Sequence, residues 1–180
     1  WGSYDEGQYG VYDNDPANAE VYGNLYNWAV VNDDRDVCPE SYHIPSDAEY
    51  TVLTDYLGGE SVAGGKMKEA GLEHWNSPNT GATNESGLTF LPAGYRYSSS
   101  GTYNYMGSSG SFWSSSEHSS NLAWRRELDS NSSTVYRSYD GKQGGFSIRC
   151  LSDETLTTTI LVPENFATIQ EAIDYSIDGD

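Results

Sequence analysis

The sequence lacks any long apolar run. No stretch approaches the roughly 18 residues that a membrane-spanning helix needs, and no charged-then-apolar leader stands at Trp1. Apolar residues make up 36% of the 180 residues, and the mean hydropathy is −0.65. We therefore expect no membrane insertion, a core rich in the 15 Tyr and 5 Trp, and, for a secreted protein, a signal upstream of Trp1.

Cysteine is scarce. The only two, Cys38 and Cys150, lie 112 residues apart, which is too far for a zinc knuckle or a CxxC redox pair. If they are joined, the bridge closes a very long loop, contributes on the order of 4–5 kcal/mol, and needs an oxidising compartment. Two unpaired buried thiols are the alternative.

Basic residues are also few. Nine Lys and Arg stand against 27 Asp and Glu, for a net charge of −18. An acidic surface repels phosphate backbones and anionic lipid, so nucleic acid and membrane surfaces are poor partners. Such a negative charge usually keeps a protein well solvated. Calcium binding or a saline habitat is the second interpretation.

Two helices are expected in the first third of the chain. Apolar residues recur at helical spacing over residues 19–31, although Gly23 weakens that pattern. Ser46 and Glu49 form a capping-box pattern before a second helix, which Gly58 and Gly59 end. A short helical turn over residues 66–70 and a strand entry at residues 88–91 follow.

The second half predicts an antiparallel meander. Short strand-like runs are separated by Ser, Asn and Gly clusters, at residues 112–113, 123–128, 134–139 and 145–151. A polar linker over residues 152–159 then leads to a strand and a helix over residues 160–180. We expect one main domain over residues 1–151 and a second that only begins at residue 160.

Several ordered motifs carry a family resemblance. They are residues 22–28 (YGNLYNW), 38–49 (CPESYHIPSDAE), 57–59 (LGG), 63–66 (AGGK), 75–87 (WNSPNTGATNESG), 91–96 (LPAGYR), 112–117 (FWSSSE) and 145–150 (GFSIRC). On these residues the chain resembles the Fibrobacter succinogenes major paralogous domain, a repeated module of bacterial surface and secreted proteins.

This resemblance implies a fold and a setting. The family is similar to the C-type-lectin and formylglycine-generating-enzyme fold group, which implies an α+β, C-type-lectin-like fold of two helices packed on small antiparallel sheets with long loops. It also implies a Cys38 to Cys150 bridge, because such folds join a cysteine near the second helix to the last strand. Family members carry an opening strand ahead of the position of Trp1, and we expect this chain to lack it. The resemblance also implies a location outside a bacterium or at its cell surface.

A second resemblance concerns the end of the chain. Residues 162–180 look like the N-terminal cap of a pectin-lyase-type parallel β-helix. A helix of about ten residues is marginal in water by itself, so the cap is expected to dock on another part of this chain or on another chain.

Catalysis is not expected. Enzymes of the wider fold group use paired cysteines, and none remains after the predicted bridge. The histidines His43, His74 and His118 show no metal-binding spacing, and no Gly-x-Ser-x-Gly elbow is present. We interpret His43 and His74 as structural.

Calcium is the candidate cofactor. Acidic and amide side chains in three loops offer hard oxygen ligands at loop spacing, without the EF-hand pattern. The candidate ligands are Asp34, Asp36, Asn79, Asn84 and Glu85. Solvated loops without an ion are the alternative.

The composition of residues 95–141 predicts recognition. Ser, Tyr, Asn and Gly make up 28 of these 47 positions, a composition typical of binding loops in which Tyr supplies rigid area and small polar residues supply adaptable hydrogen bonds. The candidate ligand-binding residues are Tyr103, Tyr105, His118, Arg125, Glu127, Asp129, Asn131, Tyr136 and Tyr139. A turn-rich meander without a ligand is the alternative.

Strand alternation refines this hypothesis. It places Trp124, Arg126 and Leu128 on one side of a strand, and Arg125, Glu127 and Asp129 on the other, exposed side. On the next strand, Tyr136 and Ser138 oppose Arg137 and Tyr139, whereas Trp113 and Trp124 are expected in the core.

Three functions compete. The first is a binding module for a glycan or a protein. The second is a structural or assembly subunit of a surface fibre or adhesin, whose partners are neighbouring copies or chains. The third is an accessory domain of a β-helix polysaccharide-active protein.

Overall fold

The computed structural model describes residues 5–154. It is a mixture of short helices and small antiparallel sheets, which confirms the α+β class. The predicted linker is described only over residues 152–154, and the predicted cap over residues 160–180 lies outside the described residues.

The first elements alternate between short strands and helices. In chain order they are β1 (Tyr9–Gly10), a 3-10 turn (Tyr12–Asn14), α1 (Pro16–Tyr22), β2 (Leu25–Tyr26), α2 (Trp28–Val31), β3 (Tyr42–His43), α3 (Asp47–Tyr56) and α4 (Glu60–Met67). The remaining elements are strands, namely β4 (Tyr95–Arg96), β5 (Tyr103–Asn104), β6 (Ser109–Ser119), β7 (Leu122–Asp129), β8 (Tyr136–Gly141) and β9 (Leu151–Ser152).

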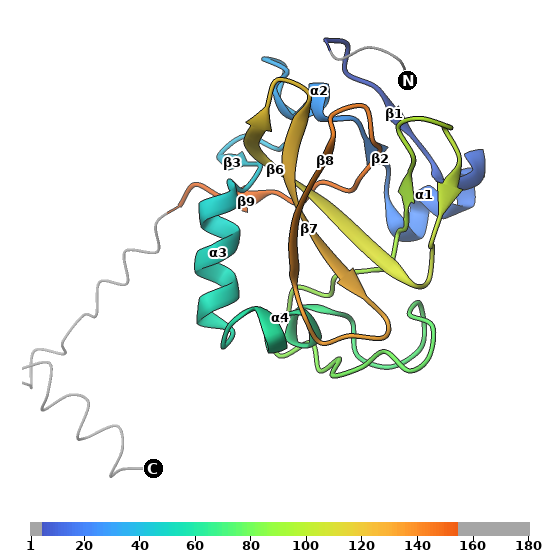
Figure 1. The fold of residues 1–180 in the computed structure, drawn as a ribbon, viewed down its shortest axis with the longest axis vertical. Coiled ribbons are helices and arrows are strands. Elements are labelled where there is room, and N and C mark those ends of the chain that lie inside the picture. Colours follow the sequence, from blue (N-terminus) through green and yellow to red (C-terminus); the bar gives the residue numbers. More distant parts are fainter. Residues whose placement is uncertain (1–4, 155–180) are drawn as a thin grey trace, which may run out of the picture.

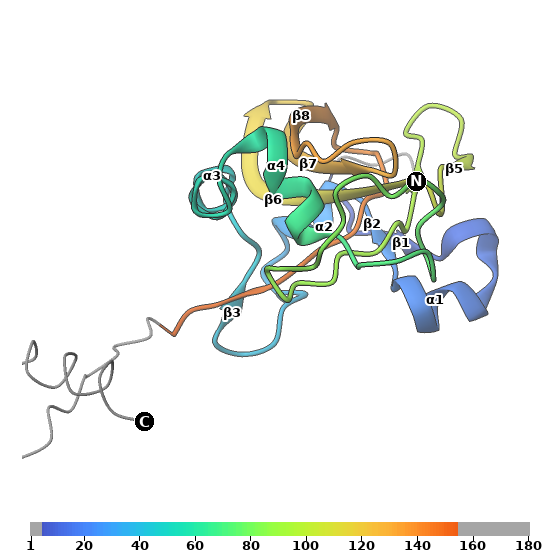
Figure 2. The ribbon, with the colours of Figure 1, turned by 90° about the horizontal axis from the view of Figure 1, so that it is seen from below.

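Four antiparallel sheets organise these strands. Their orders are β1-β2, β3-β9, β4-β5 and β6-β7-β8. The three-stranded sheet is central, with α3 and α1 on opposite sides of it (Figure 1). The β4-β5 hairpin lies on the α1 side of the molecule (Figure 2).

The predicted helix over residues 19–31 is wrong. Gly23 adopts a φ of 75° after α1, a conformation that glycine reaches without a Cβ clash. The chain then enters β2, where Tyr26 exchanges backbone hydrogen bonds with Phe146. The expected single helix is therefore two helices, α1 and α2, separated by a strand.

The predicted second helix is confirmed as α3. The Ser46 hydroxyl accepts the Glu49 amide, and the Glu49 carboxylate accepts the Ser46 amide at 2.8 Å. The helical turn predicted over residues 66–70 is wrong, because the helix in this region, α4, begins earlier and ends at Met67. Residues 88–91 contribute only a bridge from Phe90 to Lys68.

The meander is confirmed with shifted ends. The expected runs at residues 112–113, 123–128 and 134–139 become β6, β7 and β8. The run expected at residues 145–151 forms no continuous strand. Its residues make single bridges to three different partners, and only Leu151 continues into β9.

Two buried clusters form the core. One lies between α3, α4 and the sheet and contains Tyr50, Trp75, Phe112 and Leu128. The other contains Trp28, Trp113, Ala123 and Phe146. Trp113 is a core residue as predicted, whereas Trp124 is only half-buried and belongs to neither cluster.

The predicted disulfide is present. Cys38 and Cys150 are joined with a Cα–Cα distance of 5.8 Å. The bridge ties the loop before β3 to the residue before β9, and β3 and β9 pair beside it. It closes a loop of 112 residues that contains α3, α4 and the central sheet.

Candidate functional site

The central sheet and the β4-β5 hairpin together form one tyrosine-rich surface. The hairpin contributes Tyr95, Tyr97 and Tyr105, and the sheet contributes Arg125, Glu127 and Tyr136. We call these six residues the tyrosine surface. Four of them, Tyr105, Arg125, Glu127 and Tyr136, are among the residues predicted from the sequence.

Tyr95 lies at the centre of the hairpin part of this surface. Its ring centroid lies 5.3 Å from that of Tyr97 and 5.4 Å from that of Tyr105, with the Tyr105 ring stacked on it. On its other side Tyr95 meets the core ring of Phe146 edge-on at 5.7 Å. The two outer rings are therefore held by a ring that is itself packed on the core, while Tyr97 and Tyr105 stay 46% and 56% exposed.

The backbone shape of the hairpin depends on Gly94. This residue has a φ of 65°, and a Cβ there would lie 2.4 Å from the Asn104 carbonyl oxygen. No side chain fits at that approach. Gly94 thus brings the strand that bears Tyr95 against the strand that leads to Tyr105.

The sheet part follows from strand register. Glu127 on β7 is paired with Tyr136 on β8 and with Ser111 on β6, so these side chains share one face. Glu127 accepts hydrogen bonds from the Ser109 hydroxyl at 3.1 Å and from the Arg125 guanidinium at 2.6 Å. Tyr136 is 45% exposed beside this carboxylate.

A Coulombic interaction between Tyr95 and Glu127 relates the two parts of the surface. Burial, the hydrogen-bonded Tyr97 hydroxyl and the nearby Glu127 carboxylate together raise the pKa of Tyr95 above its ordinary value. The Tyr95 hydroxyl therefore stays protonated at neutral pH and can donate a hydrogen bond.

The predicted exposed face of β7 is half-buried instead. The alternation itself is confirmed, because Arg126 and Leu128 are buried on the opposite side. Arg125 packs over the Phe146 ring at 5.1 Å and pairs with Glu127 and Asp140. The segment around Phe146 covers this face, which periodicity within β7 could not indicate.

A second aromatic cluster lies on the other face of the sheet. His118 stacks on Tyr139 with 4.1 Å between centroids, and Trp124 meets both rings edge-on. The Arg137 guanidinium lies 3.6 Å from the Trp124 centroid and forms a two-pronged pair with Asp47. Two predicted residues, His118 and Tyr139, therefore belong here and not to the tyrosine surface.

The remaining three candidates serve nearby structure. Tyr103 packs against Tyr12 at 5.4 Å, with its hydroxyl 3.4 Å from Asn14. Asp129 accepts the backbone amide of Asn131 in the turn between β7 and β8. Asn131 itself is exposed at that turn.

Sequence reasoning omitted Tyr95 and Tyr97 from the candidates. A period of two was the available signal, because it sends Tyr95 and Tyr97 to one side of an extended segment. The structure adds what that pattern lacks, namely the stacking partner Tyr105, which lies across the hairpin.

The calcium candidates lie in separate loops. The Asn84 side-chain oxygen accepts the Thr89 amide, and Glu85 pairs with Lys66. Asn79 is buried and donates to the carbonyl oxygens of Glu69 and Gly71. These interactions shape the loop, and calcium binding there stays a prediction.

The other two calcium candidates lie near α2. Asp36 accepts the Cys38 amide at 2.9 Å, and Asp34 lines an acidic pocket of about 480 Å³ with Asp33 and Glu117. Lys142 lines the same pocket and supplies a positive charge there, which pairs with the Glu117 carboxylate.

One group could hold a metal ion among residues 5–154. Glu69, Glu73 and His74 place ligand atoms within 4.8 Å of one another. His74 is already hydrogen-bonded to both Glu69 oxygens, at 2.9 and 3.0 Å, and meets Tyr22 edge-on. Those contacts already give His74 the structural role expected from the sequence.

His43 also has structural partners. Its two ring nitrogens lie 2.5 Å from the Asp153 carboxylate and 3.0 Å from that of Glu49. These hydrogen bonds raise the pKa of His43 above its ordinary value. The His43 ring joins the β3-β9 sheet to the start of α3.

Comparison with known proteins places the chain in a family. No curated protein and no solved structure matches it, and none of the described helices is long and apolar enough to cross a membrane. Residues 2–152 match the family model of the Fibrobacter succinogenes major domain, and this range includes all of the motifs between residues 22 and 150. The chain therefore belongs to the Fibrobacter succinogenes major domain family.

Proposed function

We propose that this domain is a non-catalytic, extracellular binding module that recognises a glycan or protein ligand through the tyrosine surface. Its C-type-lectin-like fold is part of the same proposal, supported by the short helices, small sheets and long disulfide-closed loop. The disulfide is consistent with an oxidising, extracellular setting.

The observation that carries the proposal is the arrangement of Tyr97, Tyr105 and Tyr136. All three are about half exposed, and the first two pack against the ring of Tyr95, which meets the core ring of Phe146 on its other side. Rings held this way lose little conformational entropy when they contact a ligand. Glu127 and Arg125 lie between the hairpin and β8 and offer a charged acceptor and donor that would fix the orientation of a ligand.

The test is binding by variants of the exposed rings. Tyr105→Ala and Tyr136→Ala should each weaken binding about ten-fold or more, because truncated aromatic anchors typically cost ~1–2 kcal/mol or more. Tyr56→Ala is the matched control, since Tyr56 is 86% exposed on α3 and outside the surface. Glycan arrays and a peptide-display library would supply the ligands, with affinities measured by calorimetry.

Two outcomes oppose the proposal. Equal affinities for Tyr56→Ala, Tyr105→Ala and Tyr136→Ala would place recognition elsewhere. An absence of saturable binding in both screens, from a folded protein, would favour the structural alternative.

One observation favours that alternative, a role in assembly. β8 is an edge strand of the central sheet, and an open edge can pair with a strand of another chain. Sedimentation velocity over a range of concentrations tests this role. Concentration-dependent association abolished by Ser138→Pro would support it, and a monomer at every concentration would oppose it.

A further inference from the structure

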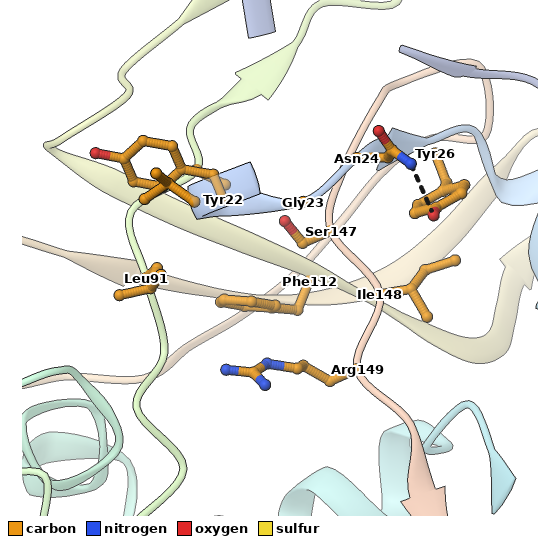
Figure 3. A pocket seen from close by; sticks show the side chains of 11 residues that line it. Tyr22, Gly23, Asn24, Tyr26, Leu91, Phe112, Ser147, Ile148 and Arg149 are labelled. Carbon is orange, nitrogen blue, oxygen red and sulfur yellow. Dashed lines mark hydrogen bonds between the residues drawn. The ribbon is translucent and has the colours of Figure 1, made fainter. Parts of the chain in front are cut away.

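A pocket lies apart from the tyrosine surface and shares no residue with it. It has a volume of about 320 Å³, at the lower end of the range for small-ligand sites. It opens between the end of α1 and the segment just before Cys150 (Figure 3). Its main side chains are Tyr22, Asn24, Leu91, Phe112, Ser147 and Arg149.

Arg149 gives this pocket a cation without an acidic partner. Its guanidinium donates to the carbonyl oxygens of Leu88 and Thr89, both at 3.0 Å, and lies 4.9 Å from the Phe90 centroid. Within residues 5–154 it pairs with no carboxylate, whereas Arg126 and Arg137 both pair with Asp47. In a chain with a net charge of −18, an arginine left without an acidic partner is unexpected.

The surroundings of Arg149 fix its position. The two carbonyl contacts use one end of the planar fork, and burial lowers the pKa of the guanidinium below its ordinary value. It remains charged at any physiological pH. Arg149 is exposed overall, and an oriented guanidinium with donors to spare is suited to bind a carboxylate through paired hydrogen bonds.

Ser147 supplies a second, independent sign of a ligand. The residue is 7% exposed, and its hydroxyl oxygen has no hydrogen-bond partner within the described part of the chain. A buried hydroxyl without a partner is unfavourable, and native proteins contain few of them. In Figure 3 this hydroxyl points toward Gly23 at the pocket wall.

The rest of the pocket is largely apolar. The Phe112 ring lies between Ser147 and Arg149 in Figure 3, with Leu91 and Ile148 on either side. Phe112 is stacked on Phe90 with 4.4 Å between centroids, so this ring is held in place. The site thus combines one cation, one hydroxyl and an apolar floor.

We propose that this pocket binds a carboxylate carried on a small apolar group, with Arg149 pairing with the carboxylate and Phe112 contacting the apolar part. The same chemistry occurs in a free short-chain acid and in the C-terminal residue of a peptide. This proposal is independent of the tyrosine surface, because the two sites have no residue in common.

The experiment titrates the full chain with four probes, followed by amide chemical shifts. Isovalerate and its amide represent the free acid, and Gly-Gly-Leu with a free or an amidated C-terminus represents the peptide end. At least one acid should saturate, with shifts around Phe112 and residues 147–149. Its amide should bind at least about ten-fold more weakly, because a charge-assisted pair is lost.

Variants separate this site from a general effect. Arg149→Gln should weaken acid binding about ten-fold and bring it to the level of the amide. Tyr105→Ala should leave acid binding unchanged. If Arg149→Gln fails to fold, the affinities of the unaltered chain for the acid and for its amide still test whether the carboxylate is recognised.

The outcomes are distinct. Saturation by isovalerate alone assigns a free acid, and saturation by the peptide alone assigns a chain end. Equal affinity for acid and amide overturns the proposal, as does the absence of any shift up to roughly ten millimolar probe. Failure here leaves the proposed role of the tyrosine surface intact, and the reverse also holds.

Discussion

At the scale of single residues, most buried charge in this domain is bound by the fold itself. Arg126 is 2% exposed and donates to the Asp47 carboxylate at 2.6 Å. Lys68 is fully buried, and its ammonium donates to the carbonyl oxygens of Thr80, Asp129 and Ser132 at 2.8–3.0 Å. All three donors of that ammonium are used, so Lys68 holds together two loops and the end of α4.

Replacing Lys68 with Met should strongly destabilise the domain. The change leaves three carbonyl oxygens without a donor, and breaking a buried charged contact of this kind costs about 3–5 kcal/mol. Lys66→Met, two residues earlier in the last turn of α4, is the control, since its pair with Glu85 is at the surface and contributes below about 1 kcal/mol. Urea unfolding of both variants measures the difference, and similar midpoints would contradict a structural role for Lys68.

His43 makes stability depend on pH. Its pKa is raised by Asp153 and Glu49, so the folded state holds the proton more tightly than the unfolded chain. The added stability is complete below the ordinary pKa of about 6.5 and is lost as pH rises through the higher folded value. Because all three side chains are more than a third exposed, the effect should be only on the order of 0.5 kcal/mol.

Thermal unfolding of the unaltered protein and His43→Gln between pH 5.5 and 8.5 tests this effect. The two proteins should converge in stability as the pH rises. A constant difference across this range would show that protonation of His43 does not stabilise the fold.

At the scale of elements, sequence patterns predicted a helix or strand correctly where its structure depends on residues close together in the sequence. The capping box of Ser46 and Glu49 and the alternation of β7 were predicted because both depend on near neighbours in sequence. Residues 19–31 were mispredicted because their strand, β2, depends on Phe146, more than 100 residues away. Tyr95 and Tyr97 were missed as candidates because Tyr105, the ring that stacks on Tyr95, lies across a hairpin.

Helix α4 shows the same dependence on distant contacts. Glycine has a low helix propensity, so the glycines of α4 do not favour a helix by themselves. The Gly65 amide donates to the Ser133 carbonyl oxygen, and the Gly65 carbonyl oxygen accepts the Thr83 amide, both at 3.0 Å. A Cβ on Gly65 would lie 2.2 Å from the Gly81 carbonyl oxygen. The helix is placed by backbone contacts that only glycine permits.

Gly65→Ala therefore tests packing against intrinsic propensity. In an exposed helix this change stabilises by about 1 kcal/mol. Here it should destabilise by about 1–3 kcal/mol, because the backbone of the loop at Gly81 must move. Denaturant unfolding gives the sign directly, and a stabilised variant would mean that the loop adapts without cost.

At the scale of the whole molecule, the disulfide is the largest single constraint. Both cysteines were predicted to pair from composition and from family resemblance, and the bridge is confirmed. The tyrosine surface could be predicted only in part from the sequence. Strand alternation predicts an exposed Arg125, whereas in the structure the segment around Phe146 covers this side chain. Sequence periodicity describes one strand at a time, whereas a binding surface is assembled from several.

Breaking the bridge should lower the stability of the whole domain. Closing a loop of 112 residues removes enough chain entropy from the unfolded state to contribute on the order of 4–5 kcal/mol. Denaturant unfolding with and without a reductant, and of the Cys38→Ser/Cys150→Ser double variant, measures this loss. Equal stability of the bridged and unbridged forms would contradict it.

The same bridge has a mechanical consequence. When the chain is pulled from both sides of the domain, tension entering at Cys38 passes through the sulfur atoms to Cys150 and bypasses the backbone between them. About 380 Å of contour length stays locked inside the loop at any force that leaves the covalent bond intact. The tyrosine-bearing hairpin and sheet lie within that loop, so axial tension along the chain would not pass through their backbone.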